Sequence, residues 1–115
     1  MHELALMTTL VERVIEIARA EKAGRVTAIR VKCGELSGVV PDALRFCFDV
    51  CVAGTIAAEA VLQIDEEPAR WACNACGAAT SLTHDTGLPH CASCGGTSLR
   101  LAAGKEFELV SLEIE

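Results

Sequence analysis

The sequence predicts an α+β fold in which two helices pack on a small three-stranded sheet, with a four-cysteine module inserted before the last strand. Apolar residues recur with helical spacing in two segments and alternate with a period of two in three others. Across residues 68–104 neither period continues, and small polar residues and paired cysteines dominate. A chain of 115 residues is expected to form one globular unit with a small appendage.

Residues 3–22 are expected to form the first helix. Charged side chains take the face opposite to a row of apolar ones, as in an amphipathic helix. The apolar row consists of Leu4, Met7, Leu10, Val11, Val14, Ile15, Ile17 and Ala18. Lys22 and Gly24 favour an end here, because a cation suits the last turn of a helix and a glycine suits the position just beyond it.

Residues 26–35 alternate as a half-buried strand does. Ile29, Val31 and Cys33 fall on one face, and Arg30 and Lys32 on the other. The first strand is therefore expected to cover an apolar core with one face only.

A second helix is predicted from Pro41 to about residue 53. Proline is tolerated at the first helical position, and Gly54 provides a stop. Cys47 and Cys51 lie four residues apart on its apolar stripe. Because free cysteine is among the most buried residue types, we interpret both, and Cys33, as core residues.

Residues 58–66 and 106–115 are predicted as the second and third strands. The composition changes at Pro68. We therefore expect one domain over residues 1–67 plus 105–115, and an inserted module over residues 68–104. The last strand has too few neighbours inside the module and is expected to return to the first sheet.

The module contains two C-x-x-C-G turns, Cys73-x-x-Cys76-Gly77 and Cys91-x-x-Cys94-Gly95, separated by a spacer. Two thiolates in one tight turn can reach a common ion at about 2.3 Å, and two such turns complete a tetrahedral site. Glycine after each pair permits positive φ, which lets backbone N–H groups point at the sulfurs. The spacing predicts a structural zinc site at Cys73, Cys76, Cys91 and Cys94.

Other uses of these cysteines fit less well or stay open. Two disulfides would need an oxidising compartment, and the opening Met1-His2-Glu3 lacks the basic region of a secretory signal. A single C-x-x-C could be a redox dithiol, but two facing copies make a closed site. Iron in a rubredoxin-like centre would use the same four ligands, so the sequence does not distinguish it from zinc.

Composition narrows the function classes. The formal net charge is −6, and between Glu67 and Gly104 the basic side chains are Arg70 and Arg100, so a nucleic-acid interface is not expected. No apolar run approaches the roughly 20 residues of a membrane span, and a soluble cytoplasmic protein without membrane insertion is expected.

An enzyme would need an open metal position with a nearby base, and no H-E-x-x-H or comparable motif is present.

Met1-His2-Glu3 is a second stretch of potential ligands. A terminal amine, the amide nitrogen of His2 and the Nδ1 atom of its ring can form adjacent chelate rings on one ion. Deprotonated amide nitrogen favours square-planar Ni(II) or Cu(II) over zinc. Glu3 could add its carboxylate or its own amide nitrogen, although an acid is also favourable at a helix N-terminus.

The chain resembles the HypA/HybF family of hydrogenase maturation factors. The resemblance covers essentially the whole sequence and rests on the opening Met1-His2-Glu3, on residues 34–41 (GELSGVVP), on the Leu44-Arg45-Phe46 helix, on the paired C-x-x-C-G turns and on residues 104–109 (GKEFEL). Ala5 stands where many relatives carry serine.

The resemblance implies a nickel metallochaperone, and not an enzyme, with Ni(II) as transferred cargo and Zn(II) as structural ion. Nickel would bind at Met1, His2 and Glu3, and zinc at the four cysteines. The implied partners are the GTPase HypB and the large subunit of a [NiFe]-hydrogenase. Some relatives also bring a histidine of the module toward nickel, for which His84 and His90 are candidates here. The alternative is a zinc-ribbon adaptor that joins proteins without transferring nickel.

Overall fold

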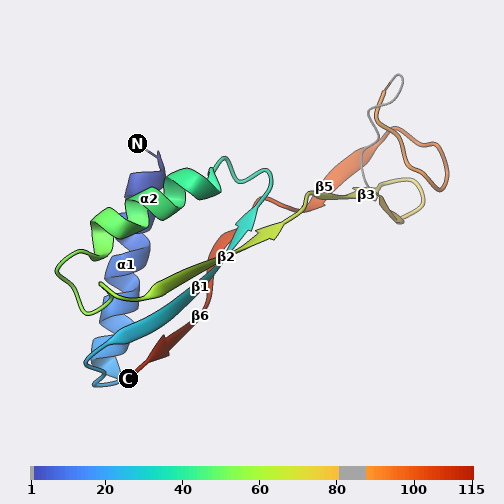
Figure 1. Ribbon diagram of the computed structural model, residues 1–115. Helices are drawn as coiled ribbons and strands as arrows, with labels where there is room; N and C mark the ends of the chain where they lie inside the picture. Colours follow the sequence, from blue (N-terminus) through green and yellow to red (C-terminus); the bar gives the residue numbers. More distant parts are fainter. Residues whose placement is uncertain (1, 81–87) are drawn as a thin grey trace.

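The computed structural model describes residues 2–80 and 88–115. It is elongated, 55 × 26 × 17 Å, with the two helices at one end and a slender module at the other (Figure 1). The helices are α1 (His2–Ala20) and α2 (Pro41–Val52). The strands are β1 (Val26–Gly34), β2 (Val61–Glu67), β3 (Arg70–Cys73), β4 (Ala79–Thr80), β5 (Leu99–Ala103) and β6 (Phe107–Ile114).

The larger sheet has the order β2-β1-β6. β1 pairs with β2 in parallel, with Ile29 opposite Leu62, and with β6 in antiparallel, with Ile29 opposite Leu112. Parallel neighbours need a crossover connection, and α2 provides it between β1 and β2. The predicted fold class and the return of the last strand to the first sheet are thus confirmed.

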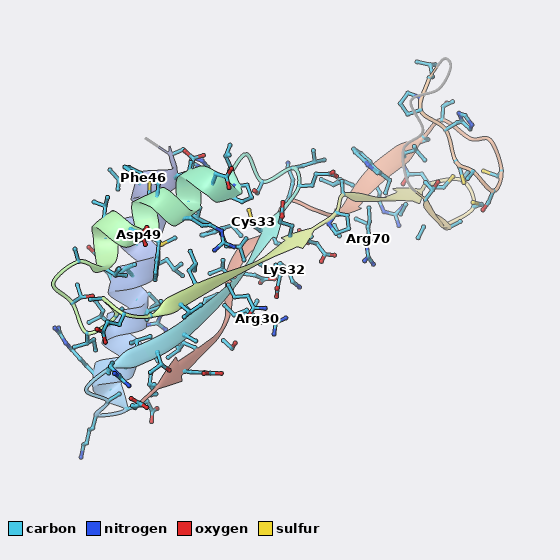
Figure 2. The ribbon with its side chains drawn as sticks, viewed as in Figure 1. Arg30, Lys32, Cys33, Phe46, Asp49 and Arg70 are labelled. Carbon is cyan, nitrogen blue, oxygen red and sulfur yellow. The ribbon has the colours of Figure 1, made fainter. Side chains whose placement is uncertain are left out.

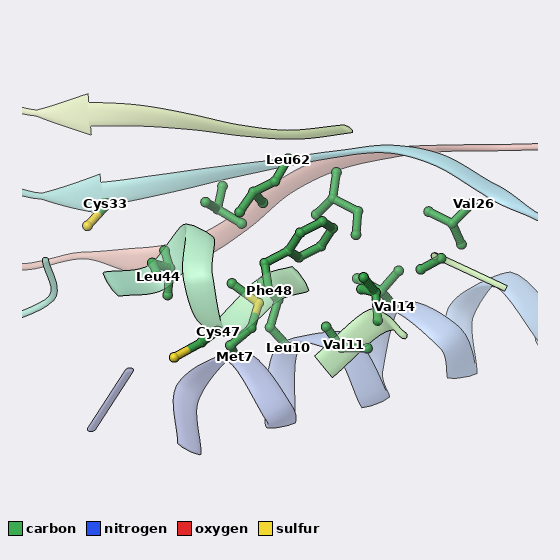
Figure 3. Packing of buried hydrophobic residues seen from close by; sticks show 14 of the residues in the cluster. Met7, Leu10, Val11, Val14, Val26, Cys33, Leu44, Cys47, Phe48 and Leu62 are labelled. Carbon is green, nitrogen blue, oxygen red and sulfur yellow. The ribbon is translucent and has the colours of Figure 1, made fainter. Parts of the chain in front are cut away.

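Both helices cover the same face of this sheet, and the hydrophobic core fills the space between the helices and the sheet (Figure 3). Met7, Val14, Ile29, Val31 and Leu44 are completely buried. The three cysteines outside the module also behave as predicted, since Cys33 and Cys47 are buried and Cys51 is half-buried. The helical and alternating patterns of the sequence therefore correspond to the two sides of one core.

No helix of the described residues covers the opposite face of the sheet, which carries charged side chains together with the exposed Val61 and Val110. On β1, the side chains of Arg30 and Lys32 point away from the two helices (Figure 2). The Nε atom of Arg30 bonds to Asp65 on β2 at 2.6 Å, and the Nζ atom of Lys32 lies 3.9 Å from Glu108 on β6. Cross-strand pairs of opposite charge suit an exposed sheet surface.

The boundaries of the elements differ slightly from the predicted ones. α1 ends at Ala20, before Lys22, which adopts a positive φ of 59°. β2 begins at Val61 rather than residue 58, because turns occupy the residues between α2 and Ala60. None of these shifts changes the face that a residue presents to the core.

The inserted module contains a second sheet, which the sequence analysis did not predict. Its order is β4-β3-β5, and both pairings are antiparallel. These strands are two to five residues long, too short to show an alternating pattern. The absence of a strand pattern over residues 68–104 therefore did not mean that strands are absent there.

Across the described ranges, no helix has the length and apolar character needed to span a membrane.

Candidate metal centre

The two C-x-x-C turns face each other in the module. Cys73 is the last residue of β3 and Cys76 lies in the following turn, while Cys91 and Cys94 lie in a turn that precedes β5. Their four Sγ atoms all lie within 4.8 Å of one another. Over residues 2–80 and 88–115 these cysteines form the one group of three or more potential ligands that converges in this way.

The spacing of the sulfurs fits a tetrahedral ion. The Sγ atoms of Cys73 and Cys94 are 3.6 Å apart, and those of Cys76 and Cys91 are 3.7 Å apart. A tetrahedron with metal–sulfur bonds of about 2.3 Å has edges of about 3.8 Å. A disulfide would bring two sulfurs to about 2.05 Å, and all four thiols are free.

The two C-x-x-C-G turns have the same backbone conformation and the same backbone hydrogen bond. Gly77 and Gly95 both adopt a φ of 76°, and their N–H groups donate to the carbonyl oxygens of Cys73 and Cys91, at 2.8 and 2.9 Å. A positive φ is costly for residues with a side chain, which explains the glycine after each cysteine pair. The two turns therefore present their sulfurs alike.

Backbone N–H groups also point at the sulfurs. The N–H of Ser93 lies 3.4 Å from the Sγ atom of Cys91, and the N–H of Gly96 lies 3.4 Å from that of Cys94. Such donors stabilise a thiolate relative to a thiol. The sequence analysis expected donors of this kind without identifying them, because the backbone conformation of the turn, and not the residue type, decides which N–H group points at a sulfur.

This environment shifts the pKa values of Cys73, Cys91 and Cys94 in different directions. The N–H groups of Cys94 and Ser93 lower the pKa of Cys91 to about 6, and those of Cys76 and Ala75 lower the pKa of Cys73. For Cys94, the N–H of Gly96 lowers the pKa, but the bonds to neighbouring sulfurs and burial outweigh it and raise the pKa to about 11. Four adjacent thiolates repel one another, so a cation is needed for all four to ionise together.

Asn74 connects the first turn to β5, and sequence reasoning missed this role. Its backbone N–H donates to the carbonyl oxygen of Ser98 at 2.9 Å, and its side-chain amide donates to the Ser98 hydroxyl at 3.0 Å. Arg100 donates to the Asn74 side-chain oxygen at 2.7 Å. These bonds hold the first cysteine pair against the strand that follows the second pair.

Two of the predicted nickel ligands, His2 and Glu3, lie in the helical part of the molecule, away from the module (Figure 1). Met1 is outside the described residues, His2 is exposed at the start of α1, and Glu3 is half-buried. The Oε2 atom of Glu3 accepts a hydrogen bond from the backbone N–H of Val40 at 3.4 Å. In the described part of the chain, His2 and Glu3 are not joined by a third potential ligand.

Of the two candidate histidines of the module, the structure describes His90. His84 lies outside the described residues. His90 is half-buried, with its Nδ1 atom 3.2 Å from the carbonyl oxygen of Leu88, and it directly precedes Cys91. The module that carries His90 extends away from the start of α1 (Figure 1).

Comparison with known proteins gives the same family across the whole length. A family model described as "Hydrogenase/urease nickel incorporation, metallochaperone, hypA" matches residues 1–114. The hydrogenase maturation factor HypA of Geobacter sulfurreducens is 40% identical, with all of both chains covered. That of Roseiflexus sp. is 42% identical, with all of this chain and 93% of the relative covered.

Two solved structures share the fold. The solution structure of a HypA protein aligns with a TM-score of 0.76 at 24% identity, covering 100% of this chain and 97% of the other. That of the Ni metallochaperone HypA from Helicobacter pylori aligns with a TM-score of 0.65 at 23% identity, covering 97% and 96%. With the fold, the four converging sulfurs and the match over residues 1–114 together, the chain belongs to the HypA family of nickel-incorporation metallochaperones of hydrogenase maturation.

Proposed function

We propose that this protein binds Ni(II) at its N-terminus and delivers it to the large subunit of a [NiFe]-hydrogenase, while Zn(II) at the four cysteines stabilises the inserted module. The family match over residues 1–114 is the observation that carries the proposal. The proposed nickel ligands are Met1, His2 and Glu3, and the proposed zinc ligands are Cys73, Cys76, Cys91 and Cys94.

The start of α1 is chemically suited to the proposed nickel site. α1 begins at His2, and the first N–H groups of a helix have no acceptor within the helix. Deprotonation of the His2 or Glu3 amide nitrogen would therefore break no hydrogen bond of α1. With Met1 as the first residue, the terminal amine, these amides and the His2 ring together offer the nitrogen donors that square-planar Ni(II) favours.

The position of His2 at the start of α1 also suits the release of Ni(II). His2 is exposed and has no place in the hydrophobic core. Protons compete with a metal for an amine and an imidazole near neutral pH. A site at an exposed chain end can thus give up its ion without unfolding the domain, and the proposed transfer involves no catalytic turnover.

Zinc is the ion that we assign to the cysteine cluster. Four thiolates with sulfur separations near 3.7 Å match a closed structural zinc site. When bound, zinc supplies the cross-link that the module otherwise lacks, since Ala72, Cys73 and Cys91 are its buried hydrophobic residues in the described ranges. The proposed division is a nickel-binding domain of residues 1–67 plus 105–115 and a zinc-binding module of residues 68–104.

The proposed partners are the GTPase HypB and the hydrogenase large subunit, in the cytoplasm. Seven free cysteines are consistent with a reducing compartment. The net charge of −6 favours association with basic protein surfaces and opposes association with nucleic acid.

The test is nickel titration by calorimetry on zinc-loaded protein that begins at Met1. His2→Ala should abolish nickel binding and leave the zinc content and the circular dichroism spectrum unchanged. Glu12→Ala is the control, because it removes an exposed polar side chain farther along α1 and should leave nickel binding intact.

Two results would count against the proposal. If His2→Ala binds nickel as tightly as the unaltered protein, the N-terminal site is wrong. If the unaltered protein has no nickel affinity, the zinc-ribbon adaptor becomes the better interpretation.

A further inference from the structure

The segment of residues 34–40, which starts at the last residue of β1 and is here called the junction loop, contacts both connections between the two sheets. Residues 68–69 lead from β2 to β3, and residues 104–106 lead from β5 back to β6. The N–H of Gly34 donates to Glu106 O at 2.7 Å, and the N–H of Leu36 donates to Gly104 O at 2.7 Å. The first residues of the junction loop are thus bonded to the returning connection.

Glu35 attaches the same loop to the outgoing connection. Its N–H donates to the carbonyl oxygen of Glu67 at 2.8 Å. Its Oε1 atom accepts a hydrogen bond from the backbone N–H of Ala69 at 2.9 Å. Of these contacts, the bond to Ala69 alone depends on a side chain of the junction loop, so it is the one that substitution can remove selectively.

The backbones meet too closely at this point for side chains. A Cβ atom on Gly34 would lie 2.2 Å from Gly104 O, and one on Gly104 would lie 2.6 Å from the Cα atom of Ala69. Gly104 also has a φ of 113°, and its N–H donates to the carboxylate oxygens of Glu106 at 2.8 and 3.1 Å. Glycine at positions 34 and 104 therefore permits the close approach of the junction loop and the two connections.

Apolar burial does not hold this arrangement. In the described residues, the core cluster and the hydrophobic side chains packed against it include no residue between Ile64 and Phe107. A cavity of about 380 Å³ lies beside the junction, lined among others by Glu35, Pro41 and Pro68. Two units joined by a small polar contact are expected to move relative to each other unless specific bonds prevent it.

The other end of the junction loop reaches the proposed nickel site. Val40 is its last residue, and the Val40 N–H donates to the carboxylate of Glu3, next to His2. One short loop is thus bonded to the connections of the cysteine module at Glu35 and to the start of α1 at Val40.

We propose that Glu35 is a positioning residue for metal delivery: through its bond to the Ala69 N–H it holds the cysteine module at a fixed orientation to the domain that carries the nickel site. The delivery role rests on the proposed function above. A fixed orientation lets one partner contact the module and the nickel-bearing end together without the cost of ordering them on binding.

The test uses residual dipolar couplings of backbone amides in the full-length, zinc-loaded protein. Couplings from β1, β2 and β6 and those from β3 and β5 should fit one alignment tensor in the unaltered protein. In Glu35→Ala the two sets should need separate tensors, and amide exchange at Ala69 should accelerate about tenfold or more, as expected for loss of a charge-assisted hydrogen bond.

Glu35→Gln is the matched control, because its side-chain oxygen can still accept from Ala69. It should restore the single tensor, whereas a residue that acts by charge alone would not be replaced by glutamine. The zinc content and the amide protection inside both sheets should be unchanged in both variants, which separates loss of orientation from unfolding.

A single tensor that fits both sheets in Glu35→Ala would overturn the proposal, as would separate tensors in the unaltered protein. Nickel titration of the same samples keeps this outcome distinct from that of the proposed function. Absence of nickel binding in the unaltered protein refutes the nickel site and leaves the orientation result standing, whereas a failed orientation test leaves the nickel result standing.

Discussion

The carboxylate of Glu3 accepts a hydrogen bond from the backbone N–H of Val40, the residue that precedes the first turn of α2. In a capping box this N–H would bond to a glutamate three positions later in the same helix. That position holds Ala43, and Val40 itself provides no side-chain cap. Glu3 thus performs this role from α1 and ties the start of one helix to the start of the other.

This relationship predicts a stability effect at an N-terminal residue. Glu3→Ala should lower the free energy of unfolding by about 0.5–1 kcal/mol, because α2 loses an acceptor and α1 loses an acid in its first turn. Glu3→Gln keeps an acceptor and should lose less. Urea unfolding monitored by circular dichroism measures both. Equal stability of Glu3→Ala and the unaltered protein would show that the contact contributes nothing.

Alanine variants of two phenylalanines test which face of α2 packs on the core. Phe48 is 4% exposed and faces the sheet (Figure 3), whereas Phe46 is 69% exposed (Figure 2). Phe48→Ala should lower the free energy of unfolding by about 3–5 kcal/mol, and Phe46→Ala should change it by about 0.5 kcal/mol or less. Comparable losses in the two variants, measured by urea unfolding, would contradict the assigned face of α2.

Removal of the metal should affect the two sheets unequally. Chelation, or Cys76→Ala, should abolish hydrogen-exchange protection in β3 and β5, because few side chains of the module are buried. Protection in β1 and β6 should persist, because those strands cover the core. Cys51→Ala is the control and should retain metal. Loss of protection in both sheets on chelation would show that they do not fold independently.

The carboxylate of Glu106 predicts a dependence of stability on pH. The N–H groups of Glu106 itself and of Gly104 lower the pKa of this carboxyl in the folded protein below its ordinary value of 4.5. A carboxyl with a lowered folded-state pKa stabilises the protein above the unfolded-state pKa and loses that contribution as the pH falls through the folded-state pKa.

Glu106→Gln should therefore destabilise the protein at pH 7 and have progressively less effect as the pH drops below about 4.5, the ordinary carboxyl value. Urea midpoints of both proteins across this range measure the difference. A difference that does not change with pH would contradict the assigned ionised contact.

The sequence predicted those parts of the fold that depend on a repeated local pattern. Ile29, Val31 and Cys33 alternate with Arg30 and Lys32, and the structure places them on opposite faces of β1. β3 and β4 escaped prediction because strands of four and two residues show no period and gain their stability from pairing and from the cysteine cross-link.

The candidate sites also combine features that a local sequence pattern predicts with features that only the assembled fold creates. The C-x-x-C spacing predicted that the two sulfurs of each turn lie close together, because a short turn limits the distance between its thiols. The pairing of β3 with β5 then brings the two turns together. Glu3 with Val40 and Glu35 with Ala69 are contacts between a side chain and a distant backbone group, which only the assembled fold brings together. The nickel ligands stay a prediction, since an exposed chain end has no core that would fix their geometry.

The most direct test of the account compares nickel titrations of two zinc-loaded proteins that both begin at Met1, one with a free terminal amine and one with that amine acetylated. Acetylation leaves every side chain in place but removes the terminal amine as a nitrogen donor. The account predicts saturable nickel binding by the protein with the free amine and a large loss of affinity in the acetylated protein. Equal affinities, or no binding by the protein with the free amine, would contradict the proposed nickel site.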